Sequence, residues 1–509
     1  MRLPLWAAGW GVECLMLAKR TLTAALGLVL IAMSTSAPER AKAFVASELW
    51  VAQSGTANAP GTSCNNPGYV GLTDVAIQAA VTDAAGNAVI HICNGTYNFS
   101  NAVSLSVDLT LQGENRSGVV LDADSLTRFF AIAQNKQVNL SSMTMREGSA
   151  TQGGAIFADY GSVVSIADIK IMNCGSLGSG KYGGAIYSFG NVNIDQSQFN
   201  NNYAEDGGAF NINGVLTLSN SQFSNNGALR YGGAANVGSA VVTSSQFTTN
   251  SSGYGGAING ASVAVSTSSF TSNTASSYGG AIYAGTATVA SSSFTSNSAE
   301  FGGAVRATEV TATASTFTSN SATGNGGGIS VNTSAAVTGS TFANNNAPYG
   351  GAISALAVTA TSSGFTGNSA TNGGAIYTYG ATITDSTFTG NHASLGGAIR
   401  TEQGATITSS TFTNNSALET GGAISAGGVV NAIGGSFTRN SAGGSGAVAY
   451  AGGGGTVCGE TQGAPGTWES CALPTTDRDD TFLPKMLLII AGVTATAGIG
   501  LRVRGAKRA

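Results

Sequence analysis

The sequence predicts an all-β fold, a right-handed parallel β-helix in which about 24 residues form each coil. Phe-x-x-Asn occurs eleven times between residues 199 and 442, and a Gly-Gly-Ala-Ile tetrad or its remnant follows each copy. The phenylalanines run from 199 to 437, and 238 residues over ten intervals give a period of 23.8 residues. No repeat has the long 3.6-residue periodicity that a helix needs, so the period indicates a solenoid of short strands.

Residues 279–299 (GGAIYAGTATVASSSFTSNSA) show how one coil is expected to form. The expected strands are Ala281–Ala284, Thr286–Ala290 and Ser292–Thr295. The expected corners are Gly285, Ser291 and the step from Ser296 to Asn297. Ile282, Val289 and Phe294 would point inward, because side chains alternate between the two faces of a strand. Stacked coils would pair each strand with its equivalents above and below and so satisfy the backbone polar groups.

Two columns of identical side chains are expected along the axis. The core ladder is expected to contain Phe199, Phe223, Phe247, Phe270, Phe294, Phe317, Phe342, Phe365, Phe388, Phe412 and Phe437. The amide ladder is expected to contain Asn202, Asn226, Asn250, Asn273, Asn297, Asn320, Asn345, Asn368, Asn391, Asn415 and Asn440. Asparagine tolerates the left-handed αL conformation, so these residues are also expected to turn the corner. The paired glycines would allow sharp turns where a Cβ would clash.

Residues 44–150 are expected to cap and begin the solenoid, ahead of the repeats at 151–442 and a C-terminal cap and linker at 443–481. A helix over Asp74–Ala84 would cover the first coil. Its helical spacing is expected to bring together Val75, Ile77, Ala80 and Val81. The expected order after the helix is a strand at Val89–Cys93, a turn at Asn94–Tyr97 and a strand at Leu109–Gly113.

The N-terminal residues 1–43 have the features of an export signal. Two basic residues precede the apolar stretch Thr21–Met33, and an A-x-A cleavage site ends at Ala43. The residues before Met16 fit this pattern poorly, so Met16 is an alternative start to Met1. An uncleaved membrane anchor is the other interpretation. We expect an exported protein.

A second apolar stretch near the C-terminus predicts an anchor at 482–501, transmembrane or part of a sorting signal, followed by a basic tail at 502–509. The positive tail would remain on the cytoplasmic side of a membrane. Upstream, Leu473–Asp477 (LPTTD) is similar to a cell-wall sorting signal of the pattern Leu-Pro-x-Thr-Gly, with Asp477 in place of the glycine. A buried terminal helix is the alternative to an anchor.

Six cysteines fit an oxidising compartment. Cys64 and Cys93 flank the first predicted helix and strand and could form a disulfide there. Cys458 and Cys471 flank a Gly/Pro-rich loop after the last repeat and could form another. Cys174 stands where other repeats have Asn and is expected to be a buried thiol. With two histidines and no C-x-x-C motif, neither a metal site nor a cofactor is expected.

The charge pattern argues against nucleic acid as a partner. The chain has a net charge of −4, and the segment 151–442 contains ten acidic and six basic residues. Nucleic-acid binding needs a basic stripe, and the repeats contain none.

The two motifs together resemble the repeats of the polymorphic outer-membrane proteins of chlamydiae, in tandem from Gly153 to Asn440. The opening of the solenoid, Ile77–Val81 through Gly95–Tyr97, is similar to the start of pectin-lyase-like right-handed β-helix proteins. The resemblance implies a surface protein with an adhesin role. Larger members of that family end in an autotransporter β-barrel, and only about 70 residues follow Asn440. We therefore expect the adhesin role, and not the secretion route, to carry over.

A polysaccharide lyase or glycoside hydrolase of the pectin-lyase-like fold is an alternative function. Such enzymes need clustered carboxylates, for acid–base work or for Ca²⁺. The acidic residues of the repeats lie on different coils or corners, so no catalytic residue is expected. Glu300, Glu309 and Arg306 share one coil as a small charged patch, and Arg400 occupies the position of Arg306 four coils later. His91 is expected to be structural. The densest polar stretch contains Asp108, Glu114, Arg116, Asp122, Asp124 and Arg128.

Six aromatic residues directly precede a Gly-Gly pair and predict a strip on the outer surface. The strip is expected to contain Tyr182, Tyr231, Tyr254, Tyr278, Phe301 and Tyr349. Such a strip suits sugar rings or a protein partner; the alternative is that the rings shield the glycine corner. The sequence thus predicts a membrane-anchored or secreted surface protein that binds a host or matrix protein or glycan through its lateral surface. A structural envelope protein is a further alternative.

Overall fold

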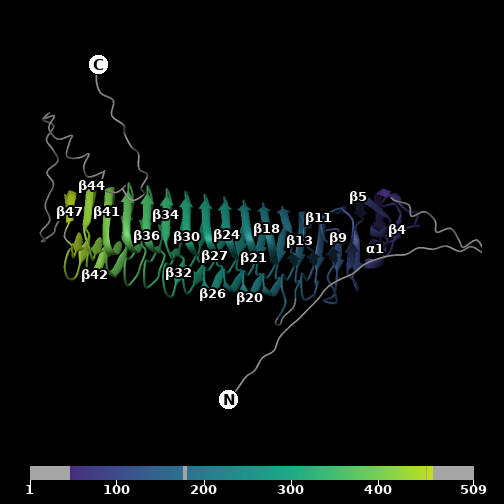
Figure 1. Ribbon diagram of the computed structural model, residues 1–509, viewed down its shortest axis with the longest axis horizontal. Coiled ribbons are helices and arrows are strands. Elements are labelled where there is room, and N and C mark those ends of the chain that lie inside the picture. Colours follow the sequence, from purple (N-terminus) through teal and green to yellow (C-terminus); the bar gives the residue numbers. More distant parts are fainter. Residues whose placement is uncertain (1–45, 176–179, 454, 462–509) are drawn as a thin grey trace, which may run out of the picture. The chain divides into compact units, whose positions relative to one another are not determined.

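The structure is a computed structural model, and it describes residues 46–175, 180–453 and 455–461 of the 509-residue chain. This part is a parallel β-solenoid of about 15 turns, which confirms the predicted fold class (Figure 1). The expected export signal, sorting motif, anchor and basic tail lie outside the described residues, as does Cys471. Within the described ranges, no helix is long and apolar enough to cross a membrane.

Each coil contributes strands to a continuous sheet of 36 strands, and a third side of the coils forms smaller sheets. The N-terminal elements are β1 (Ala46–Ala52), β2 (Gly61–Ser63), β3 (Asn66–Pro67), β4 (Tyr69–Val70), α1 (Asp74–Asp83), β5 (Ala84–Ile92), β6 (Gly95–Asn98), β7 (Val103–Leu105), β8 (Leu109–Gly113), β9 (Val119–Asp122), β10 (Phe130–Ile132), β11 (Gln137–Arg146), β12 (Ile156–Ala158), β13 (Val163–Met172), β14 (Ile186–Ser188) and β15 (Asn191–Asp195). The later strands that follow the glycine corner are β18 (Phe210–Ser219), β21 (Ala235–Thr243), β24 (Ile258–Ser266), β27 (Ile282–Ala290), β30 (Val305–Thr313), β33 (Ile329–Val331), β34 (Ser334–Thr338), β36 (Ile353–Thr361), β38 (Ile376–Thr384), β41 (Ile399–Thr413), β43 (Ile424–Ala426), β44 (Val430–Thr438), β46 (Ala449–Ala451) and β47 (Gly455–Thr461).

Two further sets of short strands complete the coils. Nine of the eleven repeated phenylalanines lie in short strands of their own, and the other two lie in β41 and β44. The nine short strands are β16 (Gln198–Asn200), β19 (Gln222–Ser224), β22 (Gln246–Thr248), β25 (Ser269–Thr271), β28 (Ser293–Thr295), β31 (Thr316–Thr318), β35 (Thr341–Ala343), β37 (Gly364–Thr366) and β39 (Thr387–Thr389). The strands of the third side are β17 (Tyr203–Asp206), β20 (Gly227–Tyr231), β23 (Ser251–Tyr254), β26 (Thr274–Tyr278), β29 (Ser298–Ala299), β32 (Ser321–Ala322), β40 (His392–Leu395), β42 (Ser416–Thr420) and β45 (Ser441–Ala442).

Neighbouring coils pair in register, so equivalent residues stack. Ile282 of β27 lies opposite Ile258 of β24 and Val305 of β30. Ile282, Val289 and Phe294 are at most 1% exposed, in agreement with the inward alternation read from the sequence. The interior is therefore built from columns of like side chains, and the backbone hydrogen bonds run from coil to coil.

The corner expected at Gly285 lies inside β27, where the chain bends without leaving the ladder. Gly285 and Thr286 are both exposed, so two successive outward positions interrupt the alternation of the strand. The expected corner at Ser291 does have positive φ, at 48°. One bend of the coil thus lies within a strand, and the next is formed by a residue in the left-handed αL conformation.

The eleven repeated phenylalanines form one continuous stack inside the solenoid. Ring centroids of consecutive coils are 4.6–5.1 Å apart and the planes are within 9° of parallel. Each ring is at most 1% exposed. Because every ring contacts its neighbours, the column forms a core that no single coil could make alone.

The eleven asparagines form a buried amide ladder, but they do not turn the corner as expected. Positive φ falls on the residue before each ladder position, for example 56° at Ser296, and not on Asn297. Asn297 points inward, where its Oδ1 accepts hydrogen bonds from N and Nδ2 of Asn273 at 2.9 and 3.1 Å. Its Nδ2 donates to Phe270 O at 2.9 Å and to Asn320 Oδ1 at 3.0 Å. The inward amide forms hydrogen bonds with backbone N–H and C=O groups at the bend, and the exposed residue before it adopts the αL conformation instead.

A second polar ladder, which the sequence reading missed, lies at the preceding corner. In each serine of this ladder except the last, Ser410, the backbone N–H donates to the hydroxyl of the next coil's serine at 3.0–3.2 Å. The ladder contains Ser197, Ser221, Ser245, Ser268, Ser292, Ser315, Ser340, Ser363, Ser386 and Ser410. The signal was present in the sequence, because a serine recurs two residues before each of these phenylalanines.

The paired glycines are required by the third corner. Gly279 has φ of +63°, a conformation that L side chains rarely adopt. A Cβ on Gly280 would lie 2.0 Å from the carbonyl oxygen of Gly303 in the next coil. The second glycine is thus fixed by the close approach of neighbouring coils, and the first by its backbone conformation.

The N-terminal end differs from expectation in three details. In α1 the buried side contains Ala76, Ile77, Ala80 and Val81. Val75 is 67% exposed, because two residues along a helix turn it by about 200° from Ile77. Gly95–Asn98 is strand β6, paired with β9, and not a turn. Strand β1, which pairs with β5 and β4, was not predicted.

Candidate functional site

Four of the six predicted strip residues form a continuous row on the third side of the coils. Parallel bridges join Tyr231 to Tyr254, Tyr254 to Tyr278, and Tyr278 to Phe301. Their ring centroids are 5.1, 5.3 and 5.5 Å apart, and all four residues are half-buried. We call these four residues the aromatic ledge. Packing along the axis keeps the rings in place, while their remaining surface faces solvent.

Tyr182 and Tyr349 lie in the same column but outside the ledge. Asp206 stands between Tyr182 and Tyr231, and a bridge joins it to each. At the other end, Asn325 lies between Phe301 and Tyr349. The sequence carried this signal, because gaps of 49 and 48 residues correspond to two coils. The predicted strip is therefore interrupted at both ends.

A hollow of about 470 Å³ opens beside the aromatic ledge. Tyr278 of the ledge and Tyr283 form part of its wall, with ring centroids 5.4 Å apart. The other side chains that matter here are Asn259, Arg306 and Asn332, which come from β24, β30 and the segment after β33. The hollow thus combines aromatic surface, two amides and one guanidinium.

Arg306 is half-buried in this hollow and is held by neutral groups. Nη1 donates to Ser330 Oγ at 2.8 Å, and Nη2 donates to Asn332 Oδ1. The guanidinium carbon lies 5.8 Å from the ring centroid of Tyr278, a cation–π distance. Burial lowers the pKa of Arg306 from its usual value, although an arginine remains charged at neutral pH.

The charged patch expected from Glu300, Glu309 and Arg306 does not form an ion pair. Glu309 accepts a hydrogen bond from Ser334 Oγ at 3.2 Å, whereas Arg306 turns toward Ser330. Among the ion pairs of the described residues, none includes Arg306. Glu309 and Arg306 thus belong to one coil, but their side chains have different hydrogen-bond partners.

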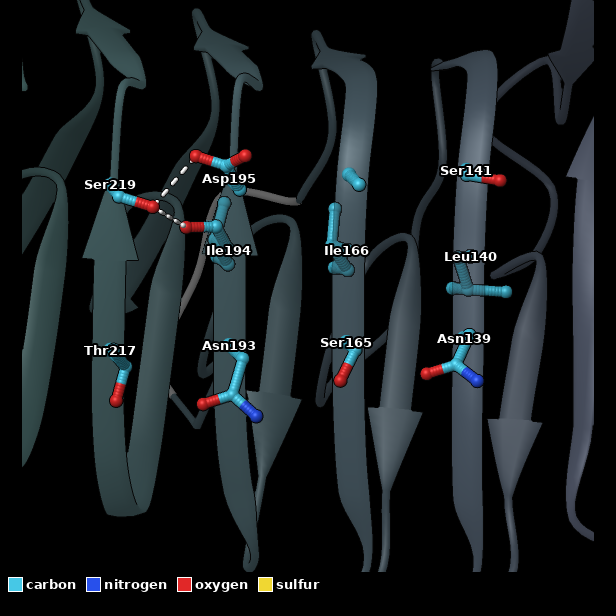
Figure 2. A pocket seen from close by; sticks show the side chains of 11 residues that line it. Asn139, Leu140, Ser141, Ser165, Ile166, Asn193, Ile194, Asp195, Thr217 and Ser219 are labelled. Carbon is cyan, nitrogen blue, oxygen red and sulfur yellow. Dashed lines mark hydrogen bonds between the residues drawn. The ribbon is translucent and has the colours of Figure 1, made fainter.

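A second hollow, of about 370 Å³, lies over β11, β13, β15 and β18 (Figure 2). Asn139, Ser165, Asn193 and Thr217 form a polar row across the four strands. Asp195 is its only carboxylate and accepts hydrogen bonds from Ser219 Oγ at 2.7 Å and Asn220 Nδ2 at 2.8 Å. These donors lower the pKa of Asp195, so it stays ionised at neutral pH and lacks a second acid for paired acid–base chemistry.

The dense polar stretch at 108–128 is dispersed over separate local contacts. Arg116 pairs with Asp168 at 3.0 Å, and Asp122 pairs with Arg146 at 2.7 Å. Asp108 and Glu114 accept backbone N–H groups of Gln137 and Asn94. Asp124 occupies a turn with φ of 44°, and Arg128 lies over the ring of Phe157 at 5.1 Å. Apart from Asp124, each of these charged side chains thus has its own local partner.

Three cysteines and His91 make contacts that stabilise the fold of the described residues. A disulfide joins Cys64 and Cys93. Cys174 is a buried free thiol whose backbone N–H donates to Asn202 Oδ1, so it occupies the position before the first ladder amide. Burial raises the pKa of the Cys174 thiol to about 12. His91 stacks on Trp50 with ring centroids 4.0 Å apart. Among the described residues, no group of three or more His, Cys, Asp or Glu could hold a metal ion.

The model of a known protein family matches segments of the repeats. The model of the Chlamydia polymorphic membrane protein repeat matches residues 267–285, 314–332, 365–379, 385–402 and 409–427. These five segments are similar to polymorphic membrane protein repeats. This confirms the resemblance drawn from the Phe-x-x-Asn and Gly-Gly-Ala-Ile motifs. No curated protein matches the chain in sequence at a significant level.

Solved structures of low similarity include three carbohydrate-active enzymes. The catalytic unit of a GH87 α-1,3-glucanase from Streptomyces thermodiastaticus strain HF3-3 has a TM-score of 0.31 and 16% identity, over 73% of this chain and 66% of that chain. The A-module of a mannuronan C-5 epimerase from Azotobacter vinelandii has a TM-score of 0.26 and 13% identity, over 76% of this chain and 96% of that chain. This chain spans less than two thirds of a second GH87 catalytic domain, at 64%. These values are too low to transfer an activity.

Proposed function

We propose that the protein is an exported cell-surface adhesin or binding scaffold that contacts a host or matrix glycan or protein through its lateral surface. The polymorphic membrane protein repeats support a surface location. A membrane anchor at 482–501 and an export signal at 1–43 belong to this proposal. The observation that carries the binding role is the aromatic ledge, because four adjacent half-buried rings offer a rigid apolar surface at little entropic cost.

Binding assays of ledge variants test this function. The full chain is applied to arrays of glycans and matrix proteins, together with a Tyr254→Ala/Tyr278→Ala double variant. Truncation of central aromatic residues typically weakens an interface by about 2 kcal/mol or more, so binding is expected to fall at least about tenfold. Tyr379→Ala is the matched control, because Tyr379 is 47% exposed and lies on another column.

Two outcomes would contradict the proposal. New reducing ends or unsaturated uronates from a polysaccharide panel would identify a polysaccharide-active enzyme. Equal binding by the double variant and the parent chain, or no binding to any probe, would favour a structural envelope protein instead. A mass spectrum of the mature termini, with cell fractionation, tests the export signal, the LPTTD segment and the anchor.

A further inference from the structure

Arg306 is the cation beside the ledge that has no carboxylate partner among the described residues. Its two terminal nitrogens donate to Ser330 and Asn332, and both partners are neutral. A cation that is partly removed from water is stabilised by an opposite charge, and the protein supplies none here. Arginine has five N–H donors, so further hydrogen-bond capacity remains on this guanidinium.

Two other arginines of the same surface show the contrast. Arg400 occupies the same column four coils later, donates to Ser425 Oγ in the same way, and pairs with Glu402 at 3.4 Å. Arg230 lies over Tyr231 at the opposite end of the ledge and pairs with Asp206 at 2.7 Å and Glu205 at 3.1 Å. The protein neutralises both of these cations, so the unpaired state of Arg306 is a local feature and not a property of the column.

The surroundings of Arg306 suit a single sugar unit that carries a carboxylate. The hollow of about 470 Å³ has aromatic surface from Tyr278 and Tyr283, on which the apolar face of a sugar ring can lie. The amides of Asn259 and Asn332 offer donors and acceptors for sugar hydroxyl groups. A carboxylate on the ring would meet the planar guanidinium, whose fork matches carboxylate geometry better than a point charge would.

We propose that the Arg306 hollow binds a saccharide that carries a carboxylate, such as a glucuronic acid unit, with the carboxylate on Arg306 and the ring against Tyr278 and Tyr283. This inference rests on the proposed binding function, since it names a ligand class for the same surface. It adds a charge requirement that the aromatic ledge alone does not impose.

Calorimetric titration of the full chain with defined oligosaccharides tests the charge requirement. The probes are a hyaluronan hexasaccharide, whose charges are carboxylates, the neutral hexa-N-acetyl form of chitohexaose (chitohexaose below), and a dextran sulfate oligosaccharide. We expect hyaluronan to bind best. A hydrogen bond to a charged group contributes about 1.5–3 kcal/mol, so Arg306→Gln should weaken hyaluronan binding about 10- to 100-fold. Arg306→Lys should recover part of the affinity, because it keeps the charge and loses the fork.

Arg400→Gln is the matched control, since it removes an equivalent arginine whose charge the protein already pairs. It should change hyaluronan binding by less than about twofold, because a distant surface position contributes little. Circular dichroism verifies that each variant is folded, and retained chitohexaose binding by Arg306→Gln provides a second test of an intact surface.

The proposal is overturned if Arg306→Gln weakens hyaluronan no more than Arg400→Gln does. It is also overturned if chitohexaose or dextran sulfate binds as tightly as hyaluronan. If these probes fail while the Tyr254→Ala/Tyr278→Ala variant still loses binding to another partner, the sugar-acid inference fails and the proposed function stands. If no partner depends on the ledge, both fail.

Discussion

The buried side chain of Asn297 makes four hydrogen bonds to residues of the two neighbouring coils. The amide accepts from the backbone and side chain of Asn273 and donates to Phe270 and Asn320. In Asn297→Ala the buried donors of Asn273 would lose their acceptor. Each buried unsatisfied group costs about 1–3 kcal/mol, so we expect a loss of about 2–5 kcal/mol of stability, measured as a lower midpoint of denaturant unfolding.

The control for this prediction is Asn372→Ala. Asn372 lies in the column before the glycine pair, is only half-buried, and its side chain makes no hydrogen bond within the described chain. Its replacement should change stability by no more than about 0.5 kcal/mol. Similar losses in both variants would show that the ladder hydrogen bonds contribute no more than an average surface amide.

At the scale of elements, one coil is a removable unit because every strand pairs in register with its equivalents. Ile376 lies opposite Ile399, so deletion of the 23 residues 376–398 would join Ala375 to Ile399. Phe412 and Asn415 would then stack on Phe365 and Asn368. We expect the shortened chain to fold and to keep the shape of the parent's far-ultraviolet circular dichroism spectrum. Its denaturant m-value should be lower by about one fifteenth, because m scales with the surface that unfolding exposes.

Deletion of half a coil is the corresponding control. Loss of residues 376–387 alone would leave the chain out of register, with polar outward residues facing the core. This variant should be insoluble or lack cooperative unfolding. A full-coil deletion that behaves as badly as the half-coil deletion would contradict the view of the coil as the unit of folding.

The period predicted the core of each coil and the corners at Ser291 and at the paired glycines, but not the αL residue beside Asn297 or the hollow at Arg306. Phe294 was predicted to lie in the core and Asn297 in an axial ladder, because residues that repeat in every coil must stack in a solenoid. The αL conformation was expected at Asn297 but lies at Ser296, because the inward hydrogen bonds of the Asn297 amide decide which of the two residues adopts it. The hollow at Arg306 was missed for a related reason. Its lining comes from several coils, and the partner of a long side chain is not encoded in the period.

For the described solenoid as a whole, stability is expected to vary along the axis. Each coil pairs only with its neighbours, so opening is easiest near an end. At the N-terminal end, α1 packs its buried side on the first coils, and the Cys64–Cys93 disulfide closes a separation of 29 residues. These two features restrain coils that have a neighbour on one side only.

Amide hydrogen exchange of a Cys64→Ser/Cys93→Ser variant tests this gradient. A disulfide across a loop of this length stabilises by about 3–4 kcal/mol, mainly by restricting the opened chain. Exchange should therefore accelerate in β5 and β8, whereas β27 and β36 should keep the protection of the parent chain, because many coils separate them from the broken link. Mass spectrometry of peptides from both regions gives the comparison in one experiment. Equal acceleration at β5 and β36 would show that the solenoid opens as a single cooperative unit and that the end restraint holds the entire stack.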